Sequence, residues 1–126
     1  MMTKNIMKHD YDLENDILFF YLKNNHSYEF SEVLDKSFVL DFSKDKIPVG
    51  LEIAKASEIF KTKKHILTNI AGGNIEITIS EETMKISINL IVNIHLKRTH
   101  TEPVNVVGDN DLNIPSIQTE VAVASS

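Results

Sequence analysis

The apolar residues between positions 84 and 96 fall on every second residue, which is the period of a β-strand rather than of a helix. At ~3.3 Å per residue this alternation predicts a strand of roughly 43 Å, well above the usual length. Such a strand either bends across two sheets or extends past its own domain to pair with another chain, and we favour the second. The apolar members of this face are Met84, Ile86, Ile88, Leu90, Val92, Ile94 and Leu96.

The composition agrees with a β-rich chain and excludes several classes of protein. The 126 residues include 16 Ile, 9 Val and 8 Thr, whose branched side chains favour a pleated, half-buried surface. The chain has no cysteine, which excludes disulfides, thiolate metal sites and a cysteine nucleophile. Its net charge of −5 and single arginine, Arg98, disfavour binding to nucleic acid or anionic lipid.

Residues 7–56 contain a series of short alternating segments separated by turn-forming residues. We expect an antiparallel β-meander here, with strands at 9–12, 17–22, near 28–33, at 38–42 and at 47–53, and a turn at 23–26. Segment 17–22 is apolar on both faces, which predicts a central strand covered on both sides or a strand that contacts a partner subunit.

The period changes to a helical one between residues 57 and 71. Ser57 is a suitable N-cap and Gly72-Gly73 a suitable C-cap, so we expect one helix at about 57–71. A long β-hairpin is expected at 74–97. The fold class is therefore expected to be α+β, with a single β-rich domain at 1–98. Residues 99–126 are expected to be an extension that forms a swapped or edge strand or a partly disordered tail.

The acidic residues at the first predicted turn have the spacing of the first half of a calcium-binding loop. Counted from Asp12, however, the glycine and the bidentate glutamate of an EF-hand are replaced by Ile17 and Lys23. We therefore interpret Asp10, Asp12, Glu14 and Asp16 as a hydrogen-bonded turn. The alternative is a metal-binding protein or metal-dependent enzyme that uses Asp12, Glu14, Asp16, Asp41 and Glu52.

Other candidate groups carry no specific signal. The five histidines are His9, His26, His65, His95 and His100, and their spacing does not predict a zinc site. Gly72-Gly73 follows a predicted helix, whereas a phosphate loop precedes one. The basic patch at 55–65 comprises Lys55, Lys61, Lys63, Lys64 and His65, which we interpret as a solvated helix face, with weak nucleic-acid binding as the alternative.

Three segments in fixed order resemble a known family. They are Tyr11-Asp12-Leu13-Glu14-Asn15-Asp16, Phe38-Val39-Leu40-Asp41-Phe42, and Val49-Gly50-Leu51-Glu52-Ile53 with the residues up to Ser57. Over about residues 7–60 the chain resembles the family catalogued as domain of unknown function 2283. The resemblance implies a small β-rich domain with no assigned activity, and it carries over no catalytic residues. It also implies an antitoxin-like role, because members are often encoded beside small RNase-like toxins.

From the residues themselves, we expect Gly50 to mark a close backbone approach or bulge, and Asp12, Asp16 and Glu52 to fix turns. We expect a non-catalytic, cytoplasmic protein-interaction module that self-associates and binds a small protein partner. No catalytic, metal or cofactor residues are predicted. No signal peptide or segment long enough to cross a membrane is apparent.

Overall fold

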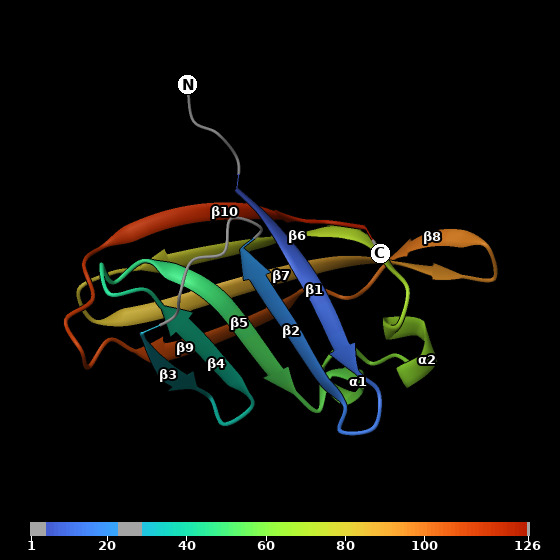
Figure 1. The fold of residues 1–126 in the computed structure, drawn as a ribbon, viewed down its shortest axis with the longest axis horizontal. Helices are drawn as coiled ribbons and strands as arrows, with labels where there is room; N and C mark the ends of the chain where they lie inside the picture. The colour runs from blue at the N-terminus through green and yellow to red at the C-terminus, as the bar shows by residue number, and fades with distance from the viewer. Residues whose placement is uncertain (1–4, 23–28, 126) are drawn as a thin grey trace.

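The computed structural model describes residues 5–22 and 29–125, and these residues form one curled sheet with two short helices beside it (Figure 1). In chain order the elements are β1 (Asn5–Asp12), β2 (Ile17–Leu22), β3 (Phe30–Leu34), β4 (Phe38–Phe42), β5 (Pro48–Ala54), α1 (Ala56–Ile59), α2 (Lys64–Leu67), β6 (Ile70–Ile79), β7 (Thr83–Ile94), β8 (Lys97–His100), β9 (Val104–Asp109) and β10 (Ile117–Val123).

The strands follow the order β3-β4-β5-β2-β1-β10-β6-β7-β8, with β9 also paired to β7. All pairs are antiparallel except β1 and β10, which are parallel, so the sheet is mixed. The sheet curls until β3 approaches β9, where a Cβ on Gly108 would lie 2.9 Å from Cγ of Leu34. The result is a front layer of β1 to β5 over a rear layer of β6, β7, β9 and β10.

The core lies between these two layers and consists of the alternate side chains of each strand. Every second residue of β7 from Met84 to Val92 is at most 1% exposed, as the alternation predicts. The front layer contributes its own alternate residues because strand side chains change face at each step. The main front-layer residues buried in the core are Leu18, Phe20, Leu40, Phe42, Leu51 and Ile53.

The expected α+β fold is wrong, because the chain is mostly β and its strands do not form a sequential meander. Although β3, β4 and β5 are consecutive neighbours, β5 returns to pair with β2, and β3 is left at the end of the order. The pairing of β2 with β5 is set by long-range packing, which short-range periodicity does not report. The turn expected at 23–26 and Tyr28 lie outside the described residues.

The single helix expected at 57–71 is also wrong. The structure has two four-residue helices separated by Lys61, whose φ of 53° is left-handed. Phe60, Leu67 and Ile70 are all buried, and their spacing imitates one face of a continuous helix. Ile70 already begins β6. Neither of the two described helices is long and apolar enough to cross a membrane.

Gly72 and Gly73 lie inside β6 and do not cap a helix. Gly73 has a φ of 147° and faces β7 so closely that a Cβ would lie 2.3 Å from the carbonyl oxygen of Asn89. The register between β6 and β7 shifts between Ile70 and Gly72, so the glycines belong to an irregularity of the ladder.

The long strand β7 is paired on both edges within the chain. β6 covers one edge, while β9 and β8 cover successive halves of the other. The pairing with another chain that we favoured for this strand is therefore replaced by internal pairing. Likewise, β10 lies between β1 and β6, in the interior of the sheet rather than at its edge or in a loose tail.

Candidate functional site

The acidic turn between β1 and β2 is built by hydrogen bonds of Asp12. Its carboxylate accepts the backbone N–H of Asn15 at 3.0 Å and the side-chain amide of Asn15 at 2.8 Å. These bonds from Asn15 lower the pKa of Asp12, because they stabilise the charged form. Asp12 therefore fixes a turn, in agreement with the hydrogen-bonded interpretation.

Asp16 joins this turn to the segment after β5. It accepts the Tyr11 hydroxyl at 2.5 Å, and the Ser57 backbone N–H and hydroxyl at 3.0 and 2.6 Å. Burial opposes ionisation of Asp16, but the bonds from Ser57 and Tyr11 outweigh it and lower its pKa. Burial and the bond to Asp16 raise the pKa of Tyr11. The expectation that Ser57 is an N-cap is therefore wrong. Lys55 occupies the N-cap position of α1, and Ser57 donates hydrogen bonds to Asp16 instead.

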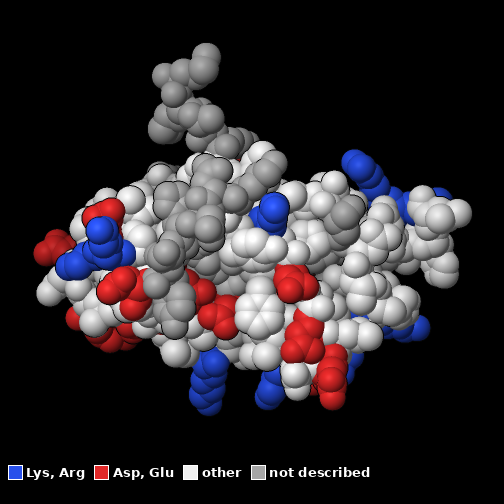
Figure 2. Space-filling view, in the orientation of Figure 1, with Lys and Arg blue, Asp and Glu red and all other residues white. Residues whose placement is uncertain are grey.

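A second group of polar residues lies on the outward surface of the front layer, which we call the front face. It consists of the outward residues of β1, β2, β4 and β5, namely Lys8, Asp10, Phe19, Tyr21, Val39, Asp41, Gly50 and Glu52. The strand register places Phe19 between Asp10 and Glu52, and Gly50 between Tyr21 and Asp41. Acidic side chains are spread across this side of the molecule, with uncharged surface and some basic side chains between and around them (Figure 2).

Two carboxyl groups of the front face interact directly. Burial, the negative charge of Asp41 and a hydrogen bond with Asp41 together raise the pKa of Glu52. The hydroxyl of Ser31 donates to Asp41 Oδ1 at 2.6 Å and so holds that carboxyl in place. Glu52 therefore lies on a strand face, and the expectation that it fixes a turn is wrong.

Gly50 leaves room for this carboxyl pair. A Cβ at this position would lie 3.1 Å from Asp41 Oδ2 and 3.2 Å from the carbonyl oxygen of Phe20. The register between β4 and β5 shifts between Asp41 and Phe42, next to Gly50 in the ladder. The expectation that Gly50 marks a close backbone approach or a bulge is confirmed.

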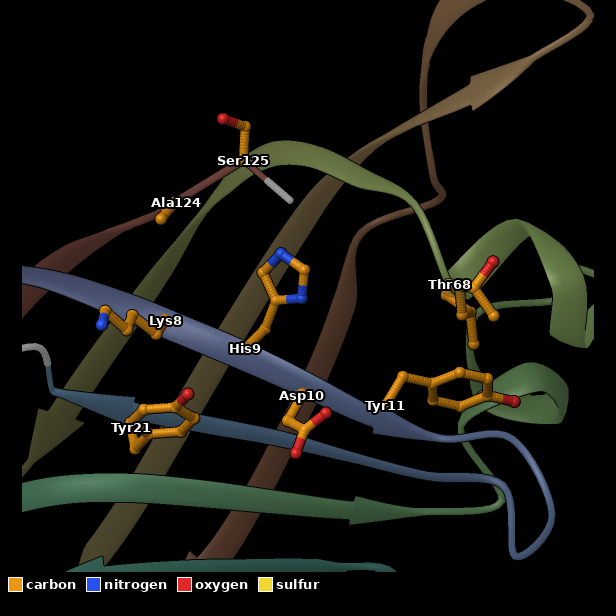
Figure 3. Close-up of a pocket in the computed structure, with 9 residues that line it drawn as sticks. Lys8, His9, Asp10, Tyr11, Tyr21, Thr68, Ala124 and Ser125 are labelled. Atoms are coloured by element: carbon orange, nitrogen blue, oxygen red, sulfur yellow. The ribbon is translucent and has the colours of Figure 1, made fainter.

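A hollow of about 370 Å³ adjoins the front face along β1 (Figure 3). It opens because β10 pairs with β1 only as far as Met7, which leaves the second half of β1 separated from the rear layer. Its lining includes His9, Asp10, Tyr11, Tyr21 and Thr68. Burial lowers the pKa of His9, against the opposing effects of a bond to the Ala124 backbone and the charge of Asp10.

The structure separates most of the other candidate residues. Asp12, Glu14 and Asp16 belong to the turn, whereas Asp41 and Glu52 belong to the front face. No three His, Asp or Glu side chains in residues 5–22 and 29–125 are grouped to hold a metal ion. His100 lies in β8, and His26 lies outside the described residues.

The basic patch is brought to a different part of the fold. Lys61, Lys63 and His65 line a cleft with His95, while Lys55 precedes α1 in a left-handed conformation. Sequence reasoning missed the meeting of His65 with His95. It did predict two apolar faces for 17–22, and the structure directs one of them, with Phe19 and Tyr21, outward. The alternation within 17–22 could have been divided into an inward and an outward face only once the partner strands were known.

The fold and the front face define a small, mostly β protein whose acidic motif residues divide between a structural turn and the outward surface of a sheet. Residues 8–57, which comprise most of β1 through the start of α1, match the family described as "Protein of unknown function (DUF2283)". This segment of the chain belongs to that family, which confirms the resemblance seen in its sequence.

A relative extends the similarity beyond the family segment. A protein of Methanosarcina mazei named "Putative hypoxanthine phosphoribosyltransferase" is 34% identical over 110 residues, which is 87% of this chain and 87% of the relative. No solved structure matches the chain significantly.

Proposed function

We propose that this protein is a non-catalytic, cytoplasmic protein-interaction module that binds a basic protein partner through the front face. The observation that carries the proposal is the exposure of an aromatic side chain, Tyr21, beside the half-buried Phe19 and among acidic residues on the outward surface of the front layer. Tyr21 is 44% exposed, although it lies on a strand whose other face is fully buried. Aromatic residues that remain accessible on such a surface are typical of interface centres.

The charges of the front face indicate the chemistry of the partner. Asp10, Asp41 and Glu52 lie around Phe19 and Tyr21, and they outnumber Lys8, which pairs with Tyr21 across the strands. The excess of negative charge favours a complementary surface that carries lysine or arginine. Such cations can pair with the carboxylates and also lie over the aromatic rings. An antitoxin-like role, in which the partner is a small basic toxin, is the form of this proposal that the family resemblance suggests.

Self-association is a second part of the proposal, and it requires a surface other than the front face. Two copies of an acidic surface repel each other, whereas exposed apolar side chains elsewhere do not. Val33 on β3 is 61% exposed and β3 ends the strand order, which makes this strand the preferred contact. Sedimentation equilibrium at micromolar concentrations tests this part, and a monomer mass throughout would contradict it.

The partner proposal is tested by quantitative affinity purification from the native cell. Phe19→Ser and Tyr21→Ser remove the outward aromatic groups, and Val107→Ser removes a side chain that is 55% exposed on β9. We expect one basic protein to be retained by the wild type and by the β9 variant and lost with both front-face variants. Equal recovery with all variants, at unchanged melting temperature, would contradict the proposal.

The printed name of the Methanosarcina mazei relative supplies a competing hypothesis from a different class. It describes an enzyme that transfers a phosphoribosyl group to hypoxanthine. Purified protein can be assayed for this transfer directly, and turnover that is lost on a front-face or hollow substitution would overturn the non-catalytic proposal.

A further inference from the structure

A cleft of about 590 Å³ lies between the segment at 61–69, which includes α2, and the end of the β7–β8 hairpin. These elements meet at the same end of the molecule, and the hairpin projects beyond the sheet there (Figure 1). The polar side chains that line the cleft are those of Thr62 and Thr68 together with Lys61, Lys63, His65, Asn69, Asn93 and His95. The volume is in the range of small-molecule sites, which is roughly 300–1,000 Å³.

The charge of the cleft is opposite to that of the whole chain. The chain carries a net charge of −5, yet none of the described residues that line the cleft is acidic. Two ammonium groups, two imidazoles and two amides are all hydrogen-bond donors or can become donors. This set of groups is suited to an anion with several oxygen acceptors.

One of these cations has a nearby acidic partner outside the cleft lining. Lys61 Nζ lies 3.1 Å from Glu102 Oε2, and the two side chains are 72% and 71% exposed. Exposed pairs of this kind contribute little to stability, typically about 0–1 kcal/mol. Lys61 can therefore exchange this partner for a bound anion at small energetic cost.

The backbone at the tip of the hairpin provides an independent observation. Ile94 pairs with Lys97, so His95 and Leu96 form a two-residue turn, and both have positive φ, of 49° and 65°. Such turns favour Asn-Gly, because most residues other than glycine, asparagine and aspartate are strained in the left-handed region. Strain of this kind is often retained at functional sites, and here it directs His95 into the cleft lining.

We propose that this cleft binds a phosphate-bearing anion. Lys63, His65 and His95 hold the phosphate, and Ile66 and Ile94 contact the sugar or base attached to it. A free nucleotide and the end of an RNA strand both present this chemistry. The proposal is independent of the partner proposed for the front face, because the cleft lining and the front face share no residue.

Isothermal titration with three ligands tests the proposal and distinguishes the sources. The ligands are inorganic pyrophosphate, adenosine diphosphate and a short single-stranded RNA, each at low and moderate salt. We expect saturable binding that weakens with salt. Tighter binding of the diphosphate than of pyrophosphate identifies a nucleotide site, and tightest binding of RNA identifies a strand end.

The decisive variants are His95→Asn and Lys63→Ala, with Lys44→Ala as the matched loss of charge at an exposed turn away from the cleft. Asparagine suits the left-handed turn, so the first variant keeps the fold while it removes the imidazole. We expect each cleft variant to weaken binding about tenfold or more, which corresponds to ~1.4 kcal/mol, while the control binds as the wild type. No saturable binding of any ligand, or equal weakening by the control, would overturn the proposal.

Discussion

Asp16 accepts two hydrogen bonds from Ser57, 41 residues later in the chain. This contact joins the first turn of the protein to the start of α1, and the Tyr11 hydroxyl completes it. Asp16 itself has a φ of 57°, a conformation that Asp and Asn tolerate better than most residues. The acidic motif that resembles a metal loop is therefore a tertiary connection.

Asp16→Asn should keep the backbone conformation but weaken these bonds. We expect a loss of about 1–3 kcal/mol at neutral pH, as for hydrogen bonds to a charged group. Because the pKa of Asp16 is lowered in the folded state, its contribution is present above the ordinary value of 3.8 and is lost as pH falls through the folded value. Urea unfolding of wild type and variant should therefore converge at acidic pH.

A double-mutant cycle with Ser57→Ala assigns the effect to this pair. We expect the double variant to be less destabilised than the sum of the single variants, because either change removes the same bonds. Strictly additive losses would show that Asp16 acts through some other contact.

Glu52→Gln should stabilise the protein at neutral pH. The pKa of Glu52 is raised in the folded state, so wild-type stability falls as pH rises from the ordinary value of 4.5 through the folded value. Glutamine resembles the protonated form and removes this fall. Melting temperatures should agree near pH 4 and diverge above it. Glu76→Gln, at an exposed position of β6, is the control, and an equal divergence there would contradict the explanation.

Gly73→Ala should be strongly destabilising, by about 3 kcal/mol or more, since a Cβ meets the Asn89 carbonyl in an interior strand. Gly72→Ala separates the causes, because its φ of 157° is similar but the nearest atom to its Cβ lies at 3.7 Å. Urea unfolding should show a much smaller loss for Gly72→Ala. Similar losses at both positions would mean that backbone conformation, and not the steric contact, dominates.

Leu96→Gly should stabilise the hairpin tip, because Leu96 has a φ of 65° and a fully exposed side chain. Relief of left-handed strain should contribute about 0.5–1 kcal/mol. A rise in melting temperature checks this result. Lys97→Gly, one residue further on in β8, should lower it instead, and a rise with both variants would indicate a general effect of glycine.

The sequence predicted those parts of the fold that depend on local alternation. Strand β4 occurs at 38–42 as expected, and the apolar face of β7 is buried from Met84 to Val92. The prediction of a single helix at 57–71 failed because Phe60, Leu67 and Ile70 have helical spacing, although the left-handed Lys61 interrupts the segment. Hydrophobic period alone cannot distinguish one helix from two short turns that cover the same core.

The topology and the candidate sites depend on register between distant strands. The pairing of Asn5 with Val121 and of Phe19 with Glu52 joins residues far apart in the chain, and no local pattern reports it. The tight turn at His95-Leu96 was not predicted from the sequence for a different reason. Neither residue is typical of a hairpin turn, so the strand was predicted to continue through them.

The position of β10 between β1 and β6 has a consequence for synthesis on the ribosome. Strands β1 and β6 are synthesised long before Ile117–Val123. Until β10 pairs with them, the backbone N–H and C=O groups along one edge of each strand have no β partner. Until that last segment arrives, the nascent chain can accept a foreign strand in the vacant place. A protein that had only the segment equivalent to residues 8–57 would lack β10. The edge of its β1 would stay unpaired unless another chain covered it.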